Sequence, residues 1–334
     1  MNTSKLIAAA LGCAGLLISS VAASAQDGTT GAAQAPATQA ATAKAPPKDI
    51  VLKGDGRCTT CHDENDSPEA LAIGKTRHGV GADKRTPTCS SCHGESVKHE
   101  KEAGRGGQKS PPPEVAFGKK TKNTAEERNQ ACLNCHQGAN RISWQSSAHA
   151  TADVACTSCH QIHNAKDRVK ERKTQAEVCF SCHKEQRAQY NRPSRHPIVE
   201  GKVTCSDCHN PHGSAGPKLM ARDSVVETCY TCHMEKRGPF IWNHQPVTED
   251  CGNCHNPHGS VNASLLKQRA PFICQQCHEA TSHRGAIPVV SGNSSLTGSS
   301  GRGATLARGC MNCHNSIHGG SSPLNDSAAR TMRR

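Results

Sequence analysis

The apolar pattern of the chain is uneven, and its one long apolar stretch lies at the start. Apolar and small residues run from Leu6 to Val21 behind Lys5, and Ala23-Ser24-Ala25 follows. A basic start, a short apolar stretch and a small-residue site are typical of a secretory signal peptide. The pattern predicts that residues 1–25 are cleaved after Ala25 and that the mature protein is periplasmic. A lipoprotein cleavage site at Cys13 stays open as an alternative.

The remaining chain divides by composition into a leader, a long central region and a tail. Residues 26–54 are rich in Ala, Thr, Gln and Pro and predict a flexible leader. Residues 55–320 carry every recognisable motif and predict one domain, and residues 321–334 form a basic tail. Mean hydropathy is −0.65. We therefore expect no apolar span in the mature chain.

Short helices are predicted where a hydroxyl residue precedes a glutamate by three positions. Thr124 with Glu127, Thr174 with Glu177, and Ser224 with Glu227 match this capping-box pattern. By contrast, residues 196–199 and 244–247 carry prolines that favour extended chain.

Composition decides what kind of core the chain can build. It has two Trp, two Tyr and four Phe, with 29 Gly and 18 Pro. These aromatic residues are too few for a large side-chain core. We expect a mostly irregular fold with short α-helices and little or no β-sheet, in which bound cofactors form the core.

Ten copies of Cys-x-x-Cys-His identify that cofactor, because this pentapeptide is the attachment signature of c-type haem. They use 20 of the 21 cysteines. The predicted attachment residues are Cys58, Cys61, Cys89, Cys92, Cys132, Cys135, Cys156, Cys159, Cys179, Cys182, Cys205, Cys208, Cys229, Cys232, Cys251, Cys254, Cys274, Cys277, Cys310 and Cys313. The sequence therefore predicts a multihaem cytochrome c with ten haems.

The 20 histidines predict two iron ligands for each haem. The motif histidines, predicted as proximal ligands, are His62, His93, His136, His160, His183, His209, His233, His255, His278 and His314. One further histidine follows each motif, and these predicted distal ligands are His78, His99, His149, His163, His196, His212, His244, His258, His283 and His318. The strict alternation favours bis-histidine ligation over scattered surface histidines.

The motifs alternate in a repeat of two haems, used five times. Such a repeat predicts an elongated haem-wire array in which each unit contacts its neighbours. Four even motifs are followed at once by a second histidine, as His160 is by His163. Three residues of extended chain reach only about 10 Å, too little to round a porphyrin, so this histidine must bind a neighbouring haem.

The formal charge of +12 does not predict a nucleic-acid partner. Each ferric haem with ionised propionates adds about −1, so ten haems nearly neutralise the mature chain. We therefore assign the basic excess to the propionates.

A full set of ligands predicts an electron carrier rather than an enzyme, because no iron keeps an open position. Three alternatives stay open. The first is a soluble periplasmic shuttle to a terminal reductase, which would resemble two copies of a pentahaem nitrite-reductase donor. The second is a multihaem reductase, and the third is an array of zinc ribbons.

Several segments resemble the MtrA/MtoA/PioA (DmsE-type) family of periplasmic decahaem c-type cytochromes. The resemblance runs from about residue 55 to about 320 and is strongest between 130 and 280. It rests on Gln161-Ile162-His163, on Cys-His-Asn-Pro-His-Gly-Ser at 208–214 and 254–260, on Lys236-Arg237-Gly238-Pro239, on the stretch from Val247 through Val261-Asn262 to Pro271, and on Cys274-Gln275-Gln276-Cys277-His278.

This resemblance implies a position inside an outer-membrane porin of the MtrB type. It further implies electron exchange between periplasmic or inner-membrane cytochromes and an extracellular multihaem cytochrome or iron mineral. Extracellular electron transfer of this kind includes metal reduction and iron(II) oxidation, and ligand spacing does not encode the direction.

Overall fold

The computed structural model describes residues 55–80, 85–104, 110–278, 310–312, 314–323 and 330. All of them belong to one unit that spans Pro47–Arg334. The predicted signal peptide, leader and Cys13 lie outside the described residues. So do His283, Cys313 and most of the tail.

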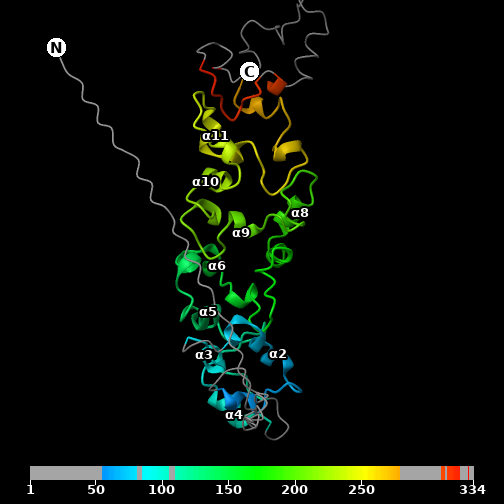
Figure 1. Cartoon of the computed structure of the whole chain (residues 1–334). Coiled ribbons are helices and arrows are strands. Elements are labelled where there is room, and N and C mark those ends of the chain that lie inside the picture. Colours follow the sequence, from blue (N-terminus) through cyan, green and yellow to red (C-terminus); the bar gives the residue numbers. More distant parts are fainter. Residues whose placement is uncertain are drawn as a thin grey trace, which may run out of the picture. The chain divides into compact units, whose positions relative to one another are not determined.

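The described chain is built from short helices joined by long loops (Figure 1). Its longest helix, α5, has nine residues. The α-helices are α1 (Gly56–Thr59), α2 (Pro68–Leu71), α3 (Cys89–His93), α4 (Val97–Glu102), α5 (Ala125–Leu133), α6 (Ala148–Thr151), α7 (Gln175–Phe180), α8 (Lys184–Tyr190), α9 (Cys205–Cys208), α10 (Val225–Tyr230) and α11 (Gln245–Glu249). The 3₁₀-helices are η1 (Ala72–Lys75), η2 (Arg77–Gly79), η3 (Ala139–Arg141), η4 (Trp144–Ser146), η5 (Cys156–Ser158), η6 (Pro217–Leu219), η7 (Met234–Lys236), η8 (Cys251–Asn253), η9 (Ala263–Leu265), η10 (Cys274–Gln276) and η12 (Cys310–Asn312).

No β-strand forms within the described ranges, where extended pairing is limited to isolated bridges such as Ser194 with Ser260. The predicted fold class of short helices in an irregular chain is therefore confirmed. The elongated form of the array stays a prediction. None of the helices in the described part is long and apolar enough to span a bilayer.

The caps explain where several helices begin, and the predictions for them were partly right. Thr124 and Glu127 form the full reciprocal box at the start of α5. At α10 the Ser224 hydroxyl accepts from the backbone N–H of Glu227. At Thr174 the predicted helix does begin, as α7, but the predicted capping box does not form, because the Thr174 hydroxyl donates to the Arg168 carbonyl at 2.7 Å.

Two further capping boxes in the described residues were not predicted, and both precede even motifs. Thr88 with Ser91 starts α3, and Thr204 with Asp207 starts α9. The N3 residue is serine or aspartate here, so a search for glutamate misses both.

The prediction of extended chain at residues 196–199 and 244–247 was wrong. Residues 245–249 form α11, which tolerates Pro246 because the first helical turn needs no N–H donor there. At residues 196–199 the chain turns, and the Ile198 N–H donates to the His196 carbonyl at 2.8 Å.

The apolar core is small, as the composition predicted. One cluster of buried side chains joins Ala176 and Phe180 of α7 to Tyr190 of α8 and to Ile198. Most other aromatic contacts are with histidines, including Trp144 with His212 at 6.2 Å between ring centroids. Outside this cluster, the bulky aromatic side chains with ring contacts pack mainly beside histidine rings.

Candidate functional site: a row of paired histidines

Every described motif forms one helical turn, which fixes the relative positions of its three reactive side chains. The N–H of the motif histidine donates to the carbonyl of the first cysteine, for example His62 to Cys58 at 3.0 Å and His160 to Cys156 at 2.9 Å. Residues i, i+3 and i+4 of such a turn lie on one face. Two sulfurs and one imidazole are therefore presented together, as one porphyrin with two thioether bonds and one axial ligand requires.

The first cysteines of the two motifs in each repeat lie against each other. Contact with Cys229 lowers the pKa of Cys251 to about 7, while the pKa of Cys229 rises. The same contact joins Cys58 to Cys89, Cys132 to Cys156, Cys179 to Cys205, and Cys274 to Cys310. Once these sulfurs carry thioether bonds, the contact joins the edges of two haems.

The second cysteines of one repeat and the next lie near enough to interact electrostatically, without the direct contact seen between first cysteines. Burial chiefly raises the pKa of Cys92, and the nearby Cys135 thiol adds to the shift. The same relation links Cys159 to Cys182, Cys208 to Cys232, and Cys254 to Cys277. Alternating first and second cysteines thus connect the ten motifs in unbroken sequence order.

Nine motif histidines each face one distal histidine across a nearly constant gap. The ring centroids of the pairs lie between 5.9 and 6.3 Å apart. The pairs are His62 with His99, His93 with His163, His136 with His78, His160 with His212, His183 with His149, His209 with His258, His233 with His196, His255 with His318, and His278 with His244. His314 is the remaining described motif histidine.

This gap fits a metal ion held between two imidazoles. Two metal–nitrogen bonds of about 2.1 Å on opposite sides of one ion put the ring centroids about 6 Å apart. Aromatic packing alone covers about 4.5–7 Å. The angle between ring planes runs from 10° to 88° in these pairs, whereas the distance hardly varies. A constant distance with a variable ring angle is the pattern that two imidazole ligands of one iron would give.

The pairs follow a rule that spacing alone did not reveal. Each distal histidine that directly follows an even motif faces the even motif of the preceding repeat, as His163 faces His93 and His258 faces His209. After an odd motif the direction reverses, so that His149 faces His183 of the next repeat. Neighbouring repeats are therefore joined twice, once in each direction.

In nine of the eighteen paired histidines Nδ1 is hydrogen-bonded to the protein, which orients the ring. Nδ1 donates to a backbone carbonyl in His93, His99 and His163, at 2.7 to 2.9 Å. The carbonyls of Pro211 and Pro257 accept from His149 and His196. Since Nδ1 carries the proton, Nε2 is the nitrogen left free to bind a metal.

Burial also keeps several of these rings neutral, the form that binds a metal. It lowers the pKa of His93, His212, His258 and His318 below the ordinary histidine value.

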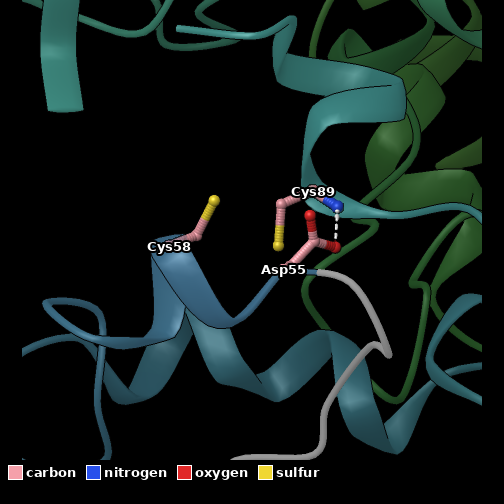
Figure 2. Close-up of side chains that lie close together, drawn as sticks. All are labelled: Asp55, Cys58 and Cys89. Carbon is pink, nitrogen blue, oxygen red and sulfur yellow. Dashed lines mark hydrogen bonds between the residues drawn. The ribbon is translucent and has the colours of Figure 1, made fainter. Parts of the chain in front are cut away.

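Sequence analysis missed Asp55, which sits beside the first two motifs. Figure 2 shows its carboxylate beside Cys89, on the side away from Cys58, with one oxygen accepting from the Cys89 N–H at 2.5 Å. These three side chains lie within 4.8 Å of one another, close enough to suggest a metal site. Because both sulfurs belong to haem-attachment motifs, we assign Asp55 a structural role instead.

The next repeat supports this assignment, since Asn129 occupies the equivalent position three residues before Cys132. Its Oδ1 accepts from the Cys156 N–H at 2.7 Å, and its Nδ2 donates to the Val154 carbonyl at 3.0 Å. In both repeats a buried polar side chain three residues before the odd motif tethers the even motif. Comparing those two positions is the signal that could have identified Asp55.

Comparisons with known proteins agree with the motifs. The doubled CXXCH motif family matches residues 196–238 and 244–283, and the family described as cytochrome c-type protein NrfB-like matches residues 89–175. Multiheme cytochrome MtrA of Shewanella baltica (strain OS185) is 45% identical over 276 residues, covering 81% of this chain and 80% of the relative. Cytochrome c-type protein NrfB of Escherichia coli O6:H1 is 27% identical over 153 residues, 44% of this chain and 74% of the relative.

Proposed function

Because the chain belongs to the family of the multihaem cytochrome MtrA, we propose that it is a relay of ten bis-histidine haems that carries electrons in sequence order. As a multihaem c-type cytochrome it transfers electrons. The finer proposal concerns the number of haems, their ligands and the path between them. The observation that carries it is the set of nine facing histidine pairs.

Each part of the motif has a defined role in this relay. The two cysteines would hold the porphyrin, and the motif and distal histidines would bind its iron. Haem iron, when bound, supplies reversible one-electron chemistry. The cysteine contacts keep successive attachment edges together, so transfer runs from motif to motif along the chain. His314 and His283 are the two ligands left for the tenth iron.

The same ligand set argues against catalysis at these irons. Two imidazoles at each of nine sites leave no open position for a substrate. We therefore assign the protein to electron transfer rather than to an enzyme class.

This ligand proposal is tested by counting haems and by their spin state. We expect ten haems per purified chain by mass spectrometry and low-spin iron throughout by electron paramagnetic resonance. A high-spin fraction of one haem or more would mean that at least one iron keeps an open position.

We also propose that the mature protein works in the periplasm and threads into an outer-membrane β-barrel of the MtrB type. The secretory signal predicted at residues 1–25 and the family relationship support this location. A polar chain can cross a bilayer only inside another protein, because unpaired backbone is not tolerated in lipid. Inside such a barrel, the relay would exchange electrons with cytochromes on either side.

Purification of solubilised outer membranes tests the partner. We expect a β-barrel protein to co-purify in equal amount with the haem-stained cytochrome. Recovery of the cytochrome alone from the periplasmic fraction would contradict the porin and favour a carrier that shuttles to a terminal reductase. The similarity of residues 89–175 to the NrfB-like family makes that carrier the second candidate.

A further inference from the structure

One histidine of the row differs from the others in the group to which its Nδ1 donates. Eight ring nitrogens with a bond in the described structure donate to neutral oxygens: seven to backbone carbonyls and His62 to the Ser67 hydroxyl. His160 instead donates to the carboxylate of Asp167 at 2.6 Å. The approach of His233 to Glu235, at 3.7 Å, is too long for a hydrogen bond.

The corresponding even motifs of later repeats show that the carboxylate is a local feature. His209 and His255 each donate to a carbonyl nine residues downstream, that of Lys218 at 3.0 Å and that of Ser264 at 2.7 Å. In the second repeat the loop after His160 is different, and Asp167 takes this place seven residues downstream.

Asp167 is held firmly enough to act on the ring. Its second oxygen accepts from the Gln161 N–H at 3.2 Å, and its side chain is only 15% exposed. A carboxylate that is both fixed and shielded from water interacts more strongly with the imidazole than an exposed one.

We propose that Asp167 is a positioning residue that lowers the reduction potential of the fourth haem through His160. This inference rests on the proposed ligation of that iron by His160 and His212, whose rings lie 6.1 Å apart. A carboxylate that accepts the Nδ1 proton makes the imidazole a stronger electron donor, which favours the ferric state. A nearby negative charge acts in the same direction.

The position of this haem gives the effect a consequence for conduction. Cys156 contacts Cys132, and Cys159 lies near Cys182, so the fourth haem would lie between the third and the fifth. One electron enters it and one leaves, and no bond forms or breaks. The fourth haem is therefore a step of low potential inside the row, which electrons cross without accumulating.

The experiment compares optical redox titrations of the purified ten-haem protein and its Asp167→Asn variant. Asparagine keeps the shape of the aspartate side chain but removes its negative charge. We expect one haem equivalent to titrate at higher potential, its reduction equilibrium changing about tenfold, or 59 mV for one electron. The control is Asp223→Asn, which removes an exposed carboxylate for which the described residues show no histidine partner.

A gain-of-charge variant makes the reverse test. Ser67→Asp puts a carboxylate beside Nδ1 of His62, now 3.1 Å from the serine hydroxyl. Ser67 is the N-cap of α2, where aspartate is equally suitable. We expect one haem equivalent to move to lower potential.

The outcomes separate this inference from the proposed function. Unchanged titrations in Asp167→Asn and Ser67→Asp, with ten low-spin haems present, would overturn the inference alone. An equal shift in Asp223→Asn would also overturn it, because the effect would then be one of net charge. High-spin iron in the unaltered protein would overturn the ligation itself.

Discussion

Four distal histidines are held by two contacts on different sides of the ring, a hydrogen bond from Nδ1 and a facing motif histidine. His149 illustrates them, since its Nδ1 donates to the Pro211 carbonyl at 2.8 Å while its ring faces His183 at 6.0 Å. The residue after Pro211 is His212, which faces His160 of the preceding repeat. One Asn-Pro-His loop thus orients one ligand with its backbone and supplies another with its side chain.

This geometry predicts which iron loses its ligand when a distal histidine is removed. We expect His149→Ala to leave one high-spin haem, at the motif of His183. In a variant that also carries Cys179→Ala and Cys182→Ala, that haem is not attached, so all nine remaining haems should be low-spin. Electron paramagnetic resonance of both variants makes the measurement. Persistent high-spin iron in the triple variant would show that His149 serves a different haem.

Two Asn-Pro-His loops can pack closely against the preceding repeat because a glycine follows the histidine in each. A Cβ atom on Gly213 would come 2.3 Å from the Ser143 carbonyl oxygen, and one on Gly259 would come 2.1 Å from that of Gln189. Both glycines have positive φ, +107° and +141°. The loop around Gly259 is also paired with the previous repeat by two hydrogen bonds between Ser194 and Ser260. Glycine therefore lets each loop reach the ligand site of its neighbour.

Replacing such a glycine should damage packing and ligation together. We expect Gly259→Ala to destabilise the protein by about 1–3 kcal/mol, the usual cost of overpacking, and to move His258 away from His209. Thermal unfolding and the high-spin fraction measure the two effects. Gly138→Ala is the matched control, since nothing lies within 4 Å of its added methyl group. Equal behaviour of the two variants would contradict the packing argument.

Apolar side chains alone form too small a core to stabilise the whole molecule. The apolar cluster formed by Ala176, Phe180, Tyr190 and Ile198 is small for a chain of 334 residues. A larger group of side chains, the paired histidines, meets only across gaps of about 6 Å that match a bound metal. The haems are therefore expected to supply most of the core.

Removal of haem should then unfold the chain. We expect protein made without haem-attachment machinery to show the far-ultraviolet circular dichroism of an unfolded polypeptide, because conformational entropy is not offset by burial. The holoprotein at equal concentration is the control. A cooperative thermal transition in the apoprotein would refute the expectation.

Local patterns in the sequence were enough to predict the motif turns, the short helices and the small core, but not the pairing of ligands. A Cys-x-x-Cys-His turn is set by neighbours in the chain, whereas His163 and His93 are 70 residues apart and meet only in the folded array. The caps at Thr88 and Thr204 were missed because serine and aspartate replace the expected glutamate. Asp55 was missed because its partner, the Cys89 N–H, is 34 residues away.

The alternating pairing rule predicts that the row can be shortened by one complete repeat without loss of iron ligands. Between the ends of the row, where His62 faces His99 of its own repeat, even motifs face a histidine of the following repeat and odd motifs one of the preceding repeat. Removal of one complete inner repeat should therefore leave every remaining iron with two histidines. We expect deletion of residues 179–228 to give an eight-haem protein that is entirely low-spin, with His149 now facing His233 and His160 facing His258.

The control deletes only residues 205–228 and so removes a single haem site. It removes both His209 and His212, the partner of His160. That shorter deletion should produce high-spin iron because the order of odd and even motifs is broken. High-spin iron in the longer deletion, with eight haems attached, would show that the repeats are not interchangeable units of the relay.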